Sequence, residues 1–131
     1  MSNMHDVMGL CLPYGKTNSE YETEFEPALG AVWARFNPKG VACYSPALLK
    51  AMIAHDEQLT ANRGRVEVDG ELRDVDYYVT ASRTPGVFNL GGDLSLFVLL
   101  IKARDRQALA QYAKLCIDVQ YPRSQSFFSP N

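Results

Sequence analysis

Apolar and polar residues alternate in the first half of this chain, which is the period of half-buried strands. Two such runs are Glu20–Glu26, with its glutamates on one face, and Gly30–Phe36, which ends at the turn signal Asn37-Pro38. A third run, Val75–Ser82, is the strongest predicted strand, and its β-branched and aromatic residues suit a buried sheet. Asp69-Gly70 lies between two shorter extended runs, which is typical of a tight hairpin.

Apolar residues recur at helical spacing in three other segments. The first helix is expected to begin at Ser45-Pro46, an N-cap followed by a first-turn proline, and to end near Asn62. Two more are predicted at about 94–103 and 105–121, joined by a charged and exposed junction. Strands followed by helices, with a loop at the carboxyl end of a strand, predict an α/β layer fold.

Composition narrows the class of protein. The chain has 131 residues, of which 47% are hydrophobic and 11% aromatic, enough for one domain with a core. A net charge of −2 supplies no basic surface for nucleic acid. The longest near-apolar run, Leu94–Ile101, is far shorter than the roughly 20 residues of a membrane span. Because the N-terminus also lacks the pattern of an export signal, we expect a cytoplasmic protein with no membrane partner.

No motif for a metal site stands out. Cys11, Cys43 and Cys116 lie far apart without a paired spacing, so we expect reduced and mostly buried thiols. The glutamates of the first strand are spread along a flat face, which favours a solvated surface over a cation site. His55 and Asp56 are neighbours on a helix and point in different directions, which favours a solvated pair over a catalytic one.

The stretch Val87–Leu94 carries the most chemical information, because it places Gly91, Gly92 and Asp93 where a predicted strand runs into a predicted helix. Glycines allow unusual dihedrals and close approach of a ligand, and the first amides of a helix lack acceptors within that helix. The corner could therefore hold an oxygen that becomes negative during a reaction. It is equally the pattern of an ordinary turn and N-cap, and spacing alone favours that second interpretation.

The same stretch resembles the signature of the crotonase (enoyl-CoA hydratase/isomerase) superfamily, in which a phenylalanine precedes a small residue, a glycine and Asp-Leu. The variant with Asn89-Leu90 is similar to the diffusible-signal-factor synthase branch. Phe36–Ser45 and the helix after it resemble the family's early strand, coenzyme A loop and first helix, and 96–119 is similar to its paired helices. The likeness extends over residues 31–121.

The resemblance implies an acyl thioester substrate, carried by coenzyme A or acyl-carrier pantetheine, with no other cofactor and no metal. It implies fatty acid chemistry of the hydratase/dehydratase (lyase) or isomerase type, and a trimer-based homo-oligomer. Gly92 would donate one of two backbone N–H groups of an oxyanion hole. The substrate-binding residues that it implies are Val41, Ala42, Phe88, Asn89, Leu90, Gly91, Gly92, Asp93 and Leu94.

In the family, the second oxyanion glycine and the catalytic carboxylates come from a later Gly-rich segment, which these 131 residues do not contain. We therefore expect a flexible segment over 1–20, the N-terminal half of a crotonase-like domain over 21–121, and an irregular tail over 122–131. The fold would be a partial crotonase-like ββα layer, truncated before the second half of the spiral core. An alternative hypothesis is a catalytically inactive fragment that binds a thioester or associates with other subunits.

Overall fold

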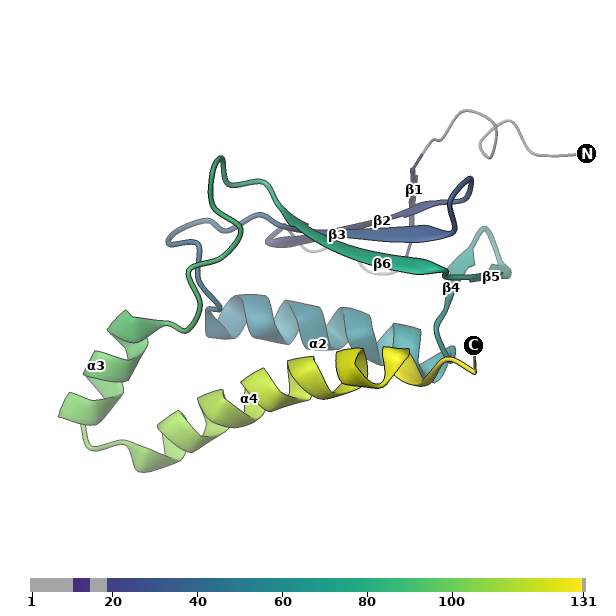
Figure 1. The fold of residues 1–131 in the computed structure, drawn as a ribbon. Coiled ribbons are helices and arrows are strands. Elements are labelled where there is room, and N and C mark those ends of the chain that lie inside the picture. Colours follow the sequence, from purple (N-terminus) through teal and green to yellow (C-terminus); the bar gives the residue numbers. More distant parts are fainter. Residues whose placement is uncertain (1–10, 15–18, 131) are drawn as a thin grey trace, which may run out of the picture.

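A computed structural model describes residues 11–14 and 19–130. These residues form a mixed α/β fold in which helices cover one face of a mixed sheet (Figure 1). The elements, in chain order, are β1 (Leu12–Pro13), β2 (Tyr21–Glu26), β3 (Ala31–Phe36), α2 (Pro46–Ala61), β4 (Arg65–Val68), β5 (Glu71–Asp74), β6 (Tyr77–Ser82), α3 (Leu94–Lys102), α4 (Arg106–Ser124) and the 3₁₀ turn η1 (Ser126–Phe128).

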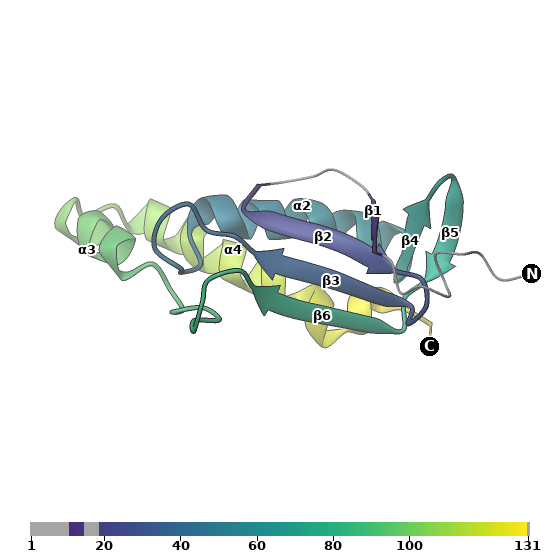
Figure 2. The same ribbon diagram turned by 90° about the horizontal axis from the view of Figure 1, so that it is seen from above.

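The main sheet has the strand order β1-β2-β3-β6 (Figure 2). β1 and β2, and likewise β2 and β3, are antiparallel, whereas β3 and β6 are parallel with Ala31 opposite Tyr77. The parallel pair is possible because α2 and the β4–β5 hairpin carry the chain back between the two strands. The predicted α/β layer architecture is confirmed at this level.

The alternating apolar residues of β2 and β3 form the core on one face of the sheet. Phe25, Val32 and Phe36 point from the sheet toward the helices and are almost fully buried, and Leu48 and Leu49 of α2 pack in the same interior. The expectation of a buried sheet at the third strand is wrong, because β6 is an edge strand and its residues are half-buried or exposed. Tyr77, on the face away from the helices, is 63% exposed.

The predicted helix starts and the hairpin are confirmed. The Ser45 hydroxyl accepts a hydrogen bond from the Leu48 N–H at 3.1 Å, and Pro46 occupies the first turn. Asp69 and Gly70 both have positive φ, as the tight turn between β4 and β5 requires. The charged α3–α4 junction is exposed, as expected.

Both ends of the described chain are more ordered than predicted. α4 continues through Pro122 to Ser124, and η1 follows it where an irregular tail was expected. The extension is stabilised because Phe127 is buried and its ring centroid lies 4.9 Å from that of Tyr78. Leu12–Pro13 pairs with β2; the rest of the segment predicted to be flexible lies largely outside the described residues.

His55 and Asp56 are buried, so the prediction of a solvated pair is wrong. The carboxylate of Asp56 accepts two hydrogen bonds from the guanidinium of Arg123, near the end of α4. The ring of His55 lies between the Tyr14 hydroxyl, 2.6 Å from Nε2, and the Asp56 carboxylate, 3.3 Å from Nδ1. Spacing within one helix could not predict this pair, because Arg123 is 67 residues from Asp56 and reaches it only when α4 packs on α2.

The hydroxyls of Tyr21 and Tyr78 complete this buried network. They are hydrogen-bonded to each other, and Arg123 Nη2 donates to Tyr21 at 3.1 Å and to Tyr78 at 3.3 Å. The network therefore ties the sheet, α2 and the end of α4 together. Its charged pair is enclosed, so loss of one partner leaves the other buried without compensation.

We expect Arg123→Ala to lower the free energy of unfolding by about 3–5 kcal/mol, because the buried Asp56 carboxylate loses its counter-ion. Urea denaturation followed by circular dichroism measures the change. Lys114→Ala is the matched control, since the Lys114–Asp118 pair is exposed on the same helix and its loss should cost at most about 1 kcal/mol. Equal losses for the two variants would contradict a structural role for the buried pair.

Alkaline pH should destabilise the fold. Burial raises the pKa of Tyr21 to about 12 and also raises the pKa values of Tyr14 and Tyr78. A tyrosine has a pKa of about 10 in the unfolded chain, so the stabilising contribution is intact below about pH 10 and is lost as the pH rises toward 12. Urea midpoints measured across this range should fall as the tyrosinate absorbance rises. A constant midpoint would refute the prediction.

Candidate functional site

Two loops meet at the carboxyl ends of β3 and β6, because parallel strands end at the same edge of a sheet. The loop after β3 contains Ala42 and Tyr44, and the loop after β6 contains the glycine corner. The Leu90 N–H donates to the Ala42 carbonyl at 2.7 Å, and the Tyr44 N–H donates to the Gly91 carbonyl at 2.8 Å. The structure thus places the two predicted parts of the site side by side.

The amides of the corner differ in how they are used. The Gly91 N–H donates to the Asn89 side chain at 2.7 Å, and the Asp93 N–H donates to the Tyr112 hydroxyl at 3.1 Å. Gly92 forms a single parallel bridge with Tyr44, but its own N–H has no acceptor among the residues described by the structure. Gly92 is exposed, so this N–H is not withdrawn into the core.

The two glycines are needed for different reasons. Gly91 has a φ of +93°, a conformation that other residues adopt only with strain. Gly92 does not have a positive φ, but a Cβ atom there would lie 3.1 Å from the ring of Phe97. The sequence predicted unusual dihedrals and close approach for the pair, but it did not show which glycine has which property.

Tyr112 of α4 holds the corner in place, a role that was missed in the sequence. Its hydroxyl donates to the Tyr44 carbonyl at 2.5 Å while accepting from the Asp93 N–H, so one buried side chain joins both loops. The ring of Phe97 packs against it nearly edge-on, with centroids 5.2 Å apart. The spacing of apolar residues places Tyr112 only within the helix predicted at 105–121, because spacing cannot show the partner of a hydroxyl group.

Exposed apolar side chains flank Gly92 on its own loop and lie on the loop that it meets. Val41, Phe88, Leu90 and Leu94 are all more than half exposed although they are large and hydrophobic. Phe36, buried at the end of β3, anchors this surface: its ring centroid lies 5.3 Å from Phe88. An exposed apolar surface around a free N–H can accommodate a ligand that combines a carbonyl oxygen with hydrocarbon groups.

The titratable groups close to the corner have structural roles. The Asp93 carboxylate caps α3 by accepting from the Leu96 N–H at 3.1 Å, as predicted. Burial and the nearby Asp93 charge raise the pKa of the Cys43 thiol, which keeps it protonated. The geometry therefore supports electrostatic binding of an oxygen, while the proton transfers of a hydratase would need groups that these two side chains do not supply.

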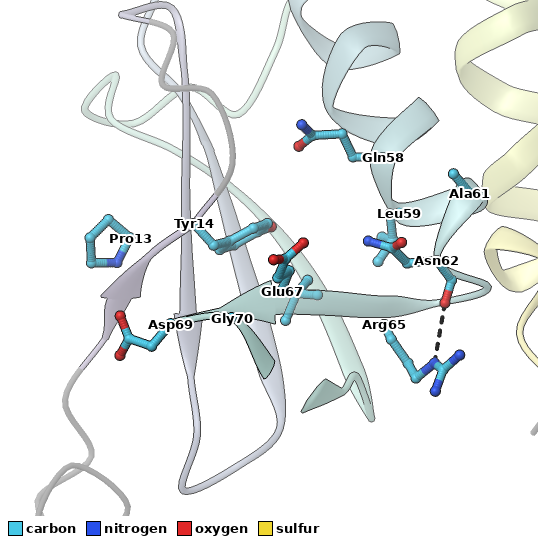
Figure 3. A pocket seen from close by; sticks show the side chains of 11 residues that line it. Pro13, Tyr14, Gln58, Leu59, Ala61, Asn62, Arg65, Glu67, Asp69 and Gly70 are labelled. Atoms are coloured by element: carbon cyan, nitrogen blue, oxygen red, sulfur yellow. Dashed lines mark hydrogen bonds between the residues drawn. The ribbon is translucent and has the colours of Figure 1, made fainter. Parts of the chain in front are cut away.

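A sizeable pocket lies elsewhere. It measures about 530 Å³ and opens between β1, the end of α2 and the β4–β5 hairpin (Figure 3). Its polar side chains point in different directions, and the Arg65 Nε–H is already donated to the Asn62 carbonyl at 3.3 Å. Glycine-corner residues do not line it. We therefore place the candidate site at the Gly92 amide, which is exposed and able to donate a hydrogen bond, and not at this pocket.

Other site types find no support in the described part of the chain. No group of three or more histidine, cysteine or acidic residues there could hold a metal ion, and none of its helices could cross a membrane. The three cysteines are free thiols; Cys43 is buried and Cys116 half-buried, but Cys11 is exposed, contrary to the expectation for buried thiols. The first-strand glutamates are partnered: Glu24 pairs with Arg35 at 3.1 Å.

Comparison with known proteins assigns no family. Neither a scan against protein-family models nor a search of curated proteins returned a match to this chain.

Tyr112→Phe should loosen the glycine corner, because the Tyr44 carbonyl and the Asp93 N–H both lose their partner. We expect a loss of about 1–3 kcal/mol in stability and faster hydrogen exchange at Asp93. Tyr121→Phe, on an exposed part of the same helix, is the control and should leave both quantities unchanged. Unchanged exchange at Asp93 in Tyr112→Phe would mean that the hydroxyl does not hold the corner.

Proposed function

We propose that this chain binds acyl thioesters of coenzyme A or acyl-carrier pantetheine, with the Gly92 N–H donating to the thioester carbonyl oxygen. The observation that carries the proposal is the exposed Gly92 amide, which finds no acceptor in the described part of the chain and lies between neighbours whose amides are occupied. A carbonyl oxygen gains negative charge when an enolate forms at the adjacent carbon. A fixed N–H stabilises that charge more than it stabilises the neutral substrate.

The apolar rim supports a thioester over a simple anion. Phosphate or sulfate would gain little from Leu90 and Leu94, whereas an acyl chain or the pantetheine arm would cover them. The loop of Val41 and Ala42 lies within hydrogen-bonding distance of the corner, which is the place that the crotonase resemblance implies for the carrier arm. The proposal also includes membership of the crotonase superfamily, a homo-oligomeric assembly and a cytoplasmic location.

The proposed reaction class is hydration or dehydration of an acyl thioester, in the manner implied by the resemblance to the signal-factor branch. One oxyanion donor of this kind contributes on the order of 3 kcal/mol to transition-state stabilisation, and general acid–base groups contribute roughly a further 10²–10⁴-fold. The second candidate is a thioester-binding chain without turnover. It is favoured by the side chains at the corner, since the Asp93 carboxylate is occupied by the helix cap.

The test removes the N–H of residue 92 and compares the result with a variant that keeps it. In a Phe97→Leu background, which makes room for a Cβ atom, Gly92→Ala keeps the amide and Gly92→Pro removes it. We expect the alanine variant to bind an enoyl-CoA with an amide shift at residue 92 in NMR spectra. The proline variant should bind about 10-fold or more weakly. Equal affinities, with circular dichroism showing both variants folded, would refute the role of Gly92.

Turnover separates the two candidates. Purified chain is incubated with enoyl and 3-hydroxyacyl thioesters, and water addition or loss is followed by the absorbance of the conjugated thioester. Product formation that depends on the Gly92 amide supports the enzyme. Binding without product supports the thioester-binding chain.

A further inference from the structure

Among the residues that the structure describes, no strand pairs with the outer edge of β6. The Tyr77 N–H donates to the Gly30 carbonyl at 3.2 Å, and the Arg83 N–H donates to the Phe36 carbonyl at 2.8 Å. Main-chain groups alternate in direction along a strand, so the odd-numbered residues of β6 face β3. The N–H and C=O groups of Tyr78, Thr80 and Ser82 therefore point away from β3. β6 is the outer strand of the sheet on this side (Figure 2).

This edge lacks the features that normally prevent pairing with another strand. Residues 77–82 contain no proline, glycine or charged residue, and their register with β3 runs without a bulge. Exposed edges in natural proteins are usually shortened, bulged, charged or covered. A straight, uncharged edge is a template for one more strand.

We propose that β6 pairs with β6 of a second copy of this chain, antiparallel about a two-fold axis at Thr80. In an antiparallel ladder, residues whose main-chain groups face the partner lie opposite one another. The outward-facing set therefore fixes the register: Thr80 lies opposite Thr80 of the second copy, and Tyr78 opposite Ser82. The result is one sheet that continues across both copies.

The side chains of the strand suit this register. It places Tyr77 directly opposite Arg83 of the second copy, on the face of the sheet away from the helices. Tyr77 is 63% exposed, and Arg83 is an exposed side chain held on that face by Glu22 at 2.5 Å. A guanidinium beside a tyrosine ring is favourable, and the two-fold axis produces the contact twice. Val79 lies opposite Ala81 of the second copy, and these apolar pairs lie between the two Tyr77–Arg83 contacts.

The layer beneath the edge adds apolar surface. The end of α4 lies against β6, since the Arg123 guanidinium is 5.5 Å from the centre of the Tyr78 ring. Ile117 and Tyr121, one turn apart on α4, are 65% and 58% exposed although they are hydrophobic. A two-fold axis through β6 brings this helix toward its copy below the joined strands. A second copy therefore matches the edge in hydrogen bonding and in the register of its side chains.

The experiment measures molecular mass by sedimentation over about a hundredfold range of concentration. We expect the wild-type chain to shift from one copy to two, and hydrogen exchange at Tyr78, Thr80 and Ser82 to slow about 10-fold or more as the dimer forms. Thr80→Pro removes an outward N–H without breaking a bond to β3, so it should remain monomeric. Thr80→Ala keeps that N–H and should still form dimers.

Three results with the wild-type chain overturn the proposal. A chain that stays monomeric at the highest concentration lacks the contact, and a mass of three copies would agree instead with a trimer-based assembly. A dimer whose Tyr78, Thr80 and Ser82 amides exchange as fast as in the monomer uses another surface. If circular dichroism shows that Thr80→Pro is unfolded, the exchange pattern of the wild-type chain decides alone. None of these measurements depends on thioester binding, so the proposed function stands or fails separately.

Discussion

The parallel pairing of β3 with β6 is the constraint on which the remaining structure depends. It requires a long connection, which α2 and the β4–β5 hairpin supply, and that connection becomes the helical layer that buries the inner face of the sheet. It also brings the carboxyl ends of both strands to one edge. The loop of Ala42 and Tyr44 therefore meets the glycine corner, although more than 40 residues separate them along the chain.

α4 stabilises this arrangement at two points. Near its middle, Tyr112 joins the two loops of the candidate site through one hydroxyl. Near its end, Arg123 neutralises Asp56 and contacts the tyrosines of the sheet. Both contacts are polar and buried, so they define the position of the helix more narrowly than apolar packing does. The geometry of the corner is thus coupled to packing of α4 along its length.

The free amide of Gly92 follows from this geometry and not from any special property of the residue. Its neighbours on either side find acceptors in Asn89 and Tyr112, and the bridge to Tyr44 uses the Gly91 carbonyl. The same local sequence in an ordinary turn would also have capped α3 through Asp93. What distinguishes the two interpretations is the environment of the amide, which here is exposed and bordered by large apolar side chains.

The sequence by itself determined the elements, because periodicity and caps are local: the alternation of β2 and β3, the Ser45 and Asp93 caps, and the Asp69-Gly70 turn all formed as predicted. Tertiary structure decided what depends on partners distant in sequence. It put β6 at an edge, buried His55 with Asp56, ordered the end of α4 and gave the Tyr112 hydroxyl its role. Spacing along the chain describes neighbours within one element, whereas burial and hydrogen-bond pairing are settled only when elements meet.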